Sequence, residues 1–368
     1  MNSRNSNGVS QRQGRDQSGP YSGTTTLIRP ERGGRDQSGP NGRGVEWTGK
    51  ASTYYGLPLI KKAHWGWQII LYFFLGGAGG GAYLVATLAD FLGSHKDTSL
   101  IRVGRYLAFV CVLISPILLI WDLGRPERFH HMLRVLKLRS PMSLGTWALS
   151  TFGLCAGLTT AYQMAQDGLL NWLPFFPRLF KRLPVKLIEI PGSFFGVFVA
   201  SYTGLLLAAT AVPIWARAKH ILGPLFLTSG LSTALASLSL ILSLSPDNED
   251  TLERLERAEM VTMTTELGLI STLPKVLGPL AKPLFKGRMG ILFGAGTIGG
   301  GILVPLLARL GFKLTRRPTP RTLNIALSLM VLTGGMILRA VWIIAGRASA
   351  DDPQATHEYN AMEWNEKR

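Results

Sequence analysis

Eight apolar segments, each long enough to cross a lipid bilayer, make up most of the sequence after residue 64. The hydrocarbon core is about 30 Å thick, and a helix needs roughly 20 apolar residues to span it. In lipid, only helices and closed barrels pair every backbone polar group. The pattern therefore predicts an all-α integral membrane protein with about eight transmembrane helices. The segments are Trp65–Leu92, Val103–Trp121, Met142–Met164, Pro191–Val212, Leu222–Leu244, Met260–Leu280, Met289–Leu310 and Leu323–Ile344.

An even number of spans places both ends of the chain on the same side of the membrane, here named side A. Side A is then expected to hold the loops Asp122–Pro141, Ile214–Ile221 and Ala281–Arg288, and side B the other connections. Lysine and arginine occur in the loops of both sides, so the excess of positive charge that marks cytoplasmic loops gives no orientation.

The first 53 residues differ from the rest of the chain in composition. They are rich in Gly, Arg and Ser and have few apolar side chains, which predicts a disordered tail. A heptapeptide that begins at Gly14 recurs at Gly34, either as a docking motif or as a local duplication. The start of the chain lacks the apolar core of a signal peptide, so none is expected. The predicted organisation is a tail over 1–53, a membrane domain over 54–347 and a polar C-terminal tail over 348–368.

The net charge of +17 could suggest a nucleic-acid partner. The basic residues, however, lie mostly in the tail and between the apolar segments, where lipid headgroups account for them. We therefore expect a bilayer, and no nucleic acid, as the partner of these charges. The two cysteines, Cys111 and Cys155, both fall within apolar segments and cannot form a CxxC motif. The chain is accordingly predicted to carry no iron–sulfur cluster of its own.

The histidines also argue against a haem. A haem inside the membrane needs axial ligands from helices, usually His, and no His of this chain lies deep in an apolar segment. On side A, histidines are instead suited to exchange protons near neutral pH. Five fall on side A and only His95 on side B; the five are His64, His130, His131, His220 and His357.

This histidine placement makes a spectroscopic prediction. The purified chain should show no Soret band in its absorption spectrum, because it has no suitably placed pair of axial ligands. A Soret band at one haem per chain would contradict the prediction.

The densest polar cluster follows the second segment, over Trp121–His131. It contains two carboxylates, two arginines and two histidines, and Asp122 and Arg125 lie at the membrane boundary. Charges of this kind often flank a helix end and pair there. The alternative is a functional site, in which Asp122 and Arg125 transfer protons or polarise a substrate.

A row of hydrogen-bonding side chains enters the membrane from side A. His64, Gln68 and Tyr72 are spaced four residues apart, so a helix through them would place all three on one face. Such a row could bind the carbonyl groups of a quinone, and Tyr202 in the fourth segment is expected near mid-membrane. The simpler interpretation is that aromatic residues here only anchor the helix at the interface.

Three charged residues are expected inside the membrane: Asp90, Glu266 and Arg339. An Asp or Arg at the centre of a membrane helix costs about 2.5–3.5 kcal/mol, so such residues are candidates for function. Glu266 and Arg339 either neutralise each other as a structural pair or serve as proton carriers and polarising groups. Arg105 lies near a segment end, from which its side chain could reach the headgroups.

Two glycine runs lie inside predicted helices, at Gly76–Gly81 and Gly294–Gly301. Small residues let membrane helices approach closely, so helix packing is the simpler interpretation. The alternative is room for a flat ring or an isoprenoid tail.

Several motifs, in this order along the chain, resemble the NrfD/PsrC family of quinone-interacting membrane subunits in polysulfide-reductase-like complexes. The resemblance runs from about residue 54 to 348. The most specific element is the Asp-Leu-Gly-Arg-Pro sequence that begins at Asp122. The others are Tyr55–Pro58, Tyr72–Gly81, Ser140–Ser143 with Trp147, Tyr202–Leu206 with Pro213–Trp215, and Gly334–Arg339.

The resemblance implies eight helices in two four-helix bundles. It also implies a quinone site at the start of the first helix, which falls on His64, Gln68 and Tyr72 with Tyr202. The bound substrate would be menaquinone or ubiquinone. A ferredoxin-like iron–sulfur subunit would dock over this face, with a further redox catalytic subunit beyond it. The sequence departs from the family where a site histidine is expected, near Leu71 and Tyr72.

The resulting hypothesis is a quinone-binding subunit of a respiratory-type oxidoreductase in the inner, cytoplasmic membrane. It would exchange electrons with its partner, move protons through Asp122, Glu266 and Arg339, and be inactive alone. The alternative is a secondary transporter or ion channel, since glycine- and proline-broken helices and midplane charges also fit that class. Transporters usually contain paired repeats, whereas the only self-similarity here relates Gly79–Val85 to Gly299–Val304. A structural anchor would not require Glu266 and Arg339 to be buried.

Overall fold

The computed structural model describes residues 60, 64–93, 97–172, 176–245, 248–316 and 318–366. The predicted tail over 1–53, its repeated heptapeptide, Tyr55–Pro58 and His95 lie outside these residues. The description below concerns the unit that begins at Thr48.

The described part of the chain is helical and has no strand, which confirms the all-α class. Within the described ranges, six helices are long and apolar enough to cross a membrane, so the chain is a multi-pass membrane protein. They are α1 (Trp67–Leu92), α2 (Thr98–Asp122), α5 (Val185–Ala208), α7 (Lys219–Leu242), the continuous helix over Gly287–Leu314, and α12 (Arg321–Asp351).

Two further helices, α3 (Pro141–Gln166) and α8 (Glu249–Leu277), have the same length but are less apolar. Counting them, eight helices of spanning length lie in the described residues, although length and composition support a membrane crossing for six. The shorter elements are η3 (Pro126–Leu133), α4 (Phe176–Phe180), α6 (Pro213–Arg217), η5 (Gly278–Ala281), α9 (Lys282–Phe285) and α13 (Pro353–Glu366). The helix over Gly287–Leu314 consists of α10 (Gly287–Ile291), the π-helix η6 (Leu292–Leu303) and α11 (Val304–Leu314).

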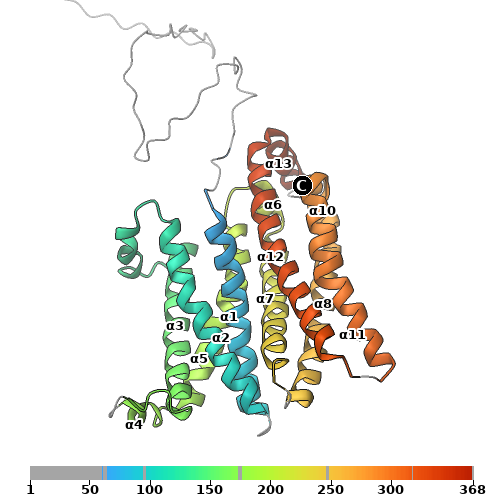
Figure 1. Cartoon of the computed structure of the whole chain (residues 1–368). Coiled ribbons are helices and arrows are strands. Elements are labelled where there is room, and N and C mark those ends of the chain that lie inside the picture. Colours follow the sequence, from blue (N-terminus) through green and yellow to red (C-terminus); the bar gives the residue numbers. More distant parts are fainter. Residues whose placement is uncertain are drawn as a thin grey trace, which may run out of the picture. The chain divides into compact units, whose positions relative to one another are not determined.

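The long helices form two groups of four (Figure 1). In the first, α1 packs against α2 and α5, and α3 covers α5. In the second, α7 packs against α8 and α12, and α12 packs against η6. Helices α1 and α5 both pack against α7, and α1 also contacts α12, so α1 and α5 together join the two groups. The starts of α1 and α3, the end of α12 and all of α13 lie at the same end of this unit, which corresponds to side A.

The structure corrects several predicted boundaries. Helix α8 begins at Glu249, eleven residues before the predicted start at Met260. Its first three turns are charged on one side, but Leu255 and Glu259 on the other side are buried. Helix α12 continues to Asp351, and α13 occupies most of the region predicted as a polar tail. Hydropathy alone misses such amphipathic ends, because their polar faces cancel the apolar signal.

The first glycine run lies where helices meet. A Cβ atom on Gly80 would lie 2.2 Å from the carbonyl oxygen of Gly196 in α5. A Cβ atom on Gly81 would lie 2.7 Å from Cβ of Ala234 in α7, and one on Gly79 would lie 2.7 Å from Cβ of Cys111 in α2. Each of these glycines therefore faces a different neighbouring helix. Helix packing, rather than room for a ring, accounts for this run.

Candidate functional site

The candidate site begins where the chain enters α1 on side A. Asp122, the last residue of α2, accepts a hydrogen bond from the backbone N–H of Gly66 at 3.4 Å. A Cβ atom on Gly66 would lie 2.2 Å from Oε1 of Gln68 and 3.5 Å from Oδ1 of Asp122. Arg347 of α12 lies within electrostatic range of Asp122. The structure thus brings together Gln68 and Asp122, which are 54 positions apart in the sequence.

Two tyrosines lie below this entrance and interact electrostatically with each other. Tyr72 of α1 and Tyr202 of α5 are both buried. The Tyr202 hydroxyl donates a hydrogen bond to the carbonyl of Pro141, the first residue of α3. A Cβ atom on Gly145 would lie 2.4 Å from the Tyr202 ring, so the ring occupies space that only glycine leaves open. Tyr202 therefore lies in the side-A part of the membrane domain and not near mid-membrane as predicted.

An aromatic wall separates this region from the second bundle. The rings of Trp65 and Trp215 stack 5.2 Å apart, and Trp65 also meets Phe73 edge to face at 6.3 Å. Trp215 is fully buried, and its indole N–H donates to the carbonyl of Trp342 in α12 at 2.9 Å. These large rings form a rigid apolar surface beside the tyrosines, of the kind that lines small-molecule sites.

Arg339 is the most buried charge of the candidate site, with none of its surface exposed. Its Nε donates to the carbonyl of Phe73 in α1 at 3.1 Å, and its Nη1 donates to Ser229 Oγ in α7 at 3.1 Å and to the carbonyl of Gly335 at 2.6 Å. The guanidinium also lies over the rings of Phe74 and Phe226. Arg339 therefore connects α1, α7 and α12 at the joint between the two bundles.

Space for this guanidinium depends on Gly77. A Cβ atom at Gly77 would lie 2.8 Å from Nη2 of Arg339 and 3.1 Å from Cα of Gly230. Nη2 has no hydrogen-bond partner among the described residues. A buried N–H group without a partner is unusual and marks a place where a water or a ligand oxygen can bind.

Glu266 of α8 is buried close to Arg339. The two side chains interact electrostatically, and Glu266 also lies beside the hydroxyls of Ser229 and Ser232. The structure thus brings Glu266 and Arg339 together, as expected from either predicted role.

Two predicted site residues lie outside the buried region. His64 is exposed and precedes α1, which begins at Trp67. It therefore does not share a helical face with Gln68 and Tyr72, and the predicted row of three is wrong for this residue. Arg125 is exposed at the start of η3. His64 lies before Gly66, where α1 has not yet begun, and Arg125 lies between the end of α2 and Pro126, where η3 begins. Side chains outside a helix do not follow the periodicity of that helix.

A second group of buried charges lies toward side B in the first bundle. Arg105 of α2 is buried and binds Glu189 of α5 and Asp90 of α1, the latter at 3.0 Å. Its Nη1 also donates to Gln163 of α3 at 2.8 Å. The expectation that Arg105 reaches the headgroups is therefore wrong. Three other helices supply its partners, and that arrangement is not visible in the spacing along α2.

Asp167, just after α3, extends this group to the surface. Burial raises its pKa, but hydrogen bonds from Arg102, Tyr106 and Gln163 outweigh burial and hold the pKa below the ordinary value for Asp. The donor atoms of Arg102 and Tyr106 both lie 2.7 Å from Oδ2. Asp167 is therefore ionised at neutral pH and fixes the side-B ends of α2 and α3 together.

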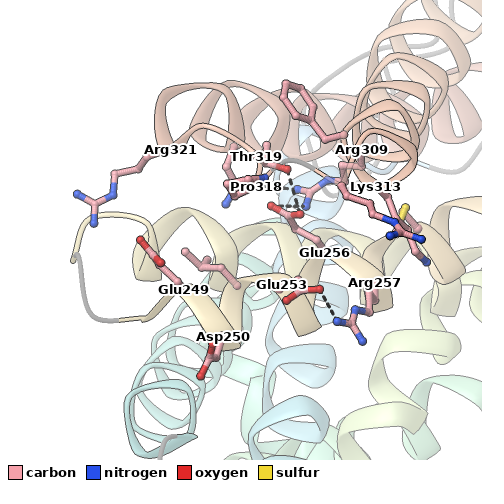
Figure 2. A pocket seen from close by; sticks show the side chains of 15 residues that line it. Glu249, Asp250, Glu253, Glu256, Arg257, Arg309, Lys313, Pro318, Thr319 and Arg321 are labelled. Atoms are coloured by element: carbon pink, nitrogen blue, oxygen red, sulfur yellow. Dashed lines mark hydrogen bonds and ion pairs between the residues drawn. The ribbon is translucent and has the colours of Figure 1, made fainter.

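A charged pocket of about 660 Å³ lies between α8, α11 and the start of α12, also on side B (Figure 2). At its base, Arg309 of α11 pairs with Glu259 at 2.5 Å, and both side chains are fully buried. Glu259 is absent from the predicted site residues, because the predicted segment starts at Met260 and leaves Glu259 in a side-B loop. The buried positions Leu255, Glu259, Met263 and Glu266 recur every three to four residues, and that period could have revealed the helix.

The two regions differ in what they can do. The side-A region offers hydrogen-bond donors and a carboxylate beside an apolar wall, a combination that can bind a flat molecule with polar ends. The side-B pocket is lined by charged residues together with apolar ones such as Leu252, Met260 and Phe312, and it leads to buried carboxylates.

Comparisons with known proteins agree on one group. A family profile described as "Polysulphide reductase, NrfD" matches residues 59–350. The "Protein NrfD homolog" of Haemophilus influenzae is 29% identical over 310 residues, covering 77% of this chain and 94% of that protein. The C chain of polysulfide reductase from Wolinella succinogenes is 28% identical over 185 residues, 48% of this chain and 57% of that protein. The C component of selenate reductase from Mesobacillus selenatarsenatis is 26% identical over 94 residues, 26% of this chain and 21% of that protein.

Proposed function

This chain belongs to the NrfD family, and on that premise we propose that it is the quinone-binding membrane subunit of a multi-subunit oxidoreductase in the cytoplasmic membrane. The observation that carries the proposal is the side-A group of Gln68, Tyr72, Asp122 and Tyr202, which lies beside the aromatic wall and above Arg339. Quinone is here the bound substrate, either menaquinone or ubiquinone.

The reaction needs two electrons and two protons for each quinone reduced to quinol, or releases them in the opposite direction. The chain's own residues would handle binding and protons. The hydroxyl of Tyr72 and the amide of Gln68 supply hydrogen bonds for a quinone oxygen, and Asp122 can exchange a proton with side A. The electrons must come from another subunit, so the chain alone is expected to be inactive.

Support for a partner comes from the surface between α2 and α3. This segment extends from the side-A end of the helices, and no residue of η3 is buried (Figure 1). It carries five basic residues among exposed apolar side chains: Arg125, Arg128, Arg134, Lys137 and Arg139, beside Phe129, Leu133, Val135, Leu136 and Leu138. A mixed basic and apolar surface suits an acidic protein partner. We propose a ferredoxin-like iron–sulfur subunit here, followed by a redox catalytic subunit, because two relatives are each named as one component of a reductase.

The site is tested by Tyr72→Phe and Asp122→Asn in the assembled complex. Each change should lower quinone turnover, because a hydrogen bond contributes about 0.5–1.5 kcal/mol, a factor of roughly 2 to 13, and loss of a proton carrier costs more. Quinone-dependent oxidation of a reduced viologen dye measures the effect. The matched control is Tyr106→Phe, which removes a hydroxyl bound to Asp167 on side B. Wild-type turnover in the assembled Tyr72→Phe/Asp122→Asn double variant would place the site elsewhere.

A further inference from the structure

The charged pocket on side B adjoins the space that lipid tails occupy. Part of its lining is apolar and comes from Met260 of α8 and Phe312 of α11. Beside these residues, Val261 and Leu310 expose 66% and 42% of their surface. Large apolar side chains exposed on membrane helices are covered by the acyl chains of the bilayer. A molecule in this pocket can therefore be in contact with the bilayer.

At the base of the pocket, a buried guanidinium uses only part of its hydrogen-bonding capacity. The Arg309 side chain is fully buried, and its Nη2 contacts Glu259 and donates to Asn324 Oδ1 at 3.1 Å. Its Nε and Nη1 have no hydrogen-bond partner among the described residues. Nη1 lies 3.7 Å from Glu256 Oε1, which is too far for a hydrogen bond. Buried donors are nearly always paired, so these two indicate an acceptor oxygen on a bound molecule or water.

Further cations lie on the same side of the pocket. Lys313 is four residues after Arg309 and shares its face of α11, and Arg316 follows just beyond the end of that helix. Arg321 begins α12 and also lines the pocket. In the described ranges, none of these three side chains forms an ion pair, and only Arg309 meets a carboxylate of α8. A phosphate group would give this set both a counter-charge and acceptor oxygens.

Carboxylates line the pocket on the side of α8 (Figure 2). Glu249 and Asp250 are the first two residues of α8, and Glu253 follows one turn later. Glu253 pairs with Arg257, whereas the Glu249 side chain has no partner in the part of the chain that the structure describes. These carboxylates are suited to accept hydrogen bonds from an ammonium group.

The lining is also ordered by depth. Glu256, the carboxylate nearest to Arg309 in the pocket, lies seven residues after Glu249, a rise of about 10 Å along α8 toward the membrane interior. Met260 lies one turn further in. From the interior outward, the pocket thus presents an apolar surface, then the Arg309 guanidinium, then the Glu249 carboxylate. A phospholipid with an amine headgroup carries its acyl chains, its phosphate and its ammonium in the same order.

We propose that this pocket binds phosphatidylethanolamine from the side-B leaflet. The phosphate accepts hydrogen bonds from Nε and Nη1 of Arg309 and lies beside Lys313 and Arg316. The ammonium donates to Glu249, and the acyl chains run over Met260 into the bilayer. A primary ammonium has three N–H donors, which the quaternary ammonium of phosphatidylcholine lacks, so the carboxylates select between the two lipids.

The test uses the full chain, delipidated in a neutral detergent. It is titrated with phosphatidylethanolamine, phosphatidylcholine or phosphatidylglycerol of identical acyl chains, and native mass spectrometry gives the number bound and the Kd. We expect one tightly held phosphatidylethanolamine per chain. Its affinity should be at least about tenfold higher than that of the other two lipids, because hydrogen bonds between charged groups are stronger than neutral ones.

Variants separate the two ends of the headgroup. Lys313→Gln/Arg316→Gln should weaken phosphatidylethanolamine and phosphatidylglycerol alike, about tenfold, because both lipids carry the phosphate. Glu249→Gln should weaken only phosphatidylethanolamine and so reduce its preference over phosphatidylcholine. The matched control is Arg178→Gln/Lys181→Gln, which removes two exposed cations at the side-B helix α4 and should bind all three lipids as the wild type does.

Three results would overturn the inference. Equal wild-type affinities for phosphatidylethanolamine and phosphatidylcholine would show that the carboxylates do not hold an ammonium. Tighter binding of phosphatidylglycerol would show a site for anionic lipid. Displacement of the lipid by equimolar soluble phosphoethanolamine would show a site for a soluble ligand. All three comparisons use the wild type, so they hold even if a variant fails to fold, and none bears on the quinone site, which lies on side A.

Discussion

Replacing Arg105 with methionine is expected to lower the free energy of unfolding by about 3–5 kcal/mol, the usual cost of removing one partner from a buried ion pair. Arg105 is buried and binds the carboxylates of Glu189 and Asp90 together with the amide of Gln163. Methionine fills a similar volume, so the loss comes from the unpaired charges. Unfolding in mixed detergent micelles measures the effect.

Two variants test that explanation. Arg105→Met combined with Glu189→Gln should be more stable than Arg105→Met alone, because the second change removes the most deeply buried unpaired charge. Arg102→Met should cost no more than about 1 kcal/mol, since the Arg102 side chain is half exposed in its pair with Asp167. Equal losses for Arg105→Met and Arg102→Met would show that the buried network does not stabilise the fold as argued.

The second large effect is expected at Gly80. A Cβ atom there would lie 2.2 Å from a backbone oxygen of α5, and a backbone cannot rotate away as a side chain can. Gly80→Val should therefore force α1 and α5 apart and cost at least the upper end of the usual range for overpacking, about 1–3 kcal/mol. We expect a lower yield of folded protein and a lower midpoint of thermal unfolding in detergent.

The matched control is Gly294→Val, in the second glycine run. A Cβ atom at Gly294 would meet no atom of a neighbouring helix within 4 Å. The two variants add the same side chain to a glycine-rich membrane helix, an α-helix at Gly80 and a π-helix at Gly294, and they differ most in what the new Cβ atom meets. If Gly294→Val is as damaging as Gly80→Val, the loss comes from glycine flexibility and not from close packing.

Much of the fold could be predicted from the sequence, because the bilayer imposes a minimum length on apolar segments. Each predicted segment corresponds to a long helix, and the end of α1 at Leu92 is confirmed. The errors lie at ends where a helix is amphipathic, as in α8 before Met260. There the charged face points away from the core, and the mean hydropathy of all residues in the segment hides the buried face.

The candidate site was harder to predict. Residues next to a helix start or end, such as Gln68 and Asp122, could be placed on side A because topology fixes their depth. The partners of Arg105 could not be predicted in this way, because Asp90, Gln163 and Glu189 come from three other helices. Contacts of that kind depend on how the helices rotate around their axes. In α2 the lipid-facing side and the buried side are both apolar, so its hydropathy does not fix that rotation.

The position of α1 also has a consequence for synthesis. The bond between Arg339 and the carbonyl of Phe73 joins residues 266 positions apart. At about 5–20 residues per second, a ribosome needs roughly 13 to 53 seconds to make that stretch. During this time α1, the first long helix to be made, has not met its last partner. Nascent α1 therefore needs a temporary neighbour for its glycine-lined face, such as lipid or an insertion factor, until α12 arrives.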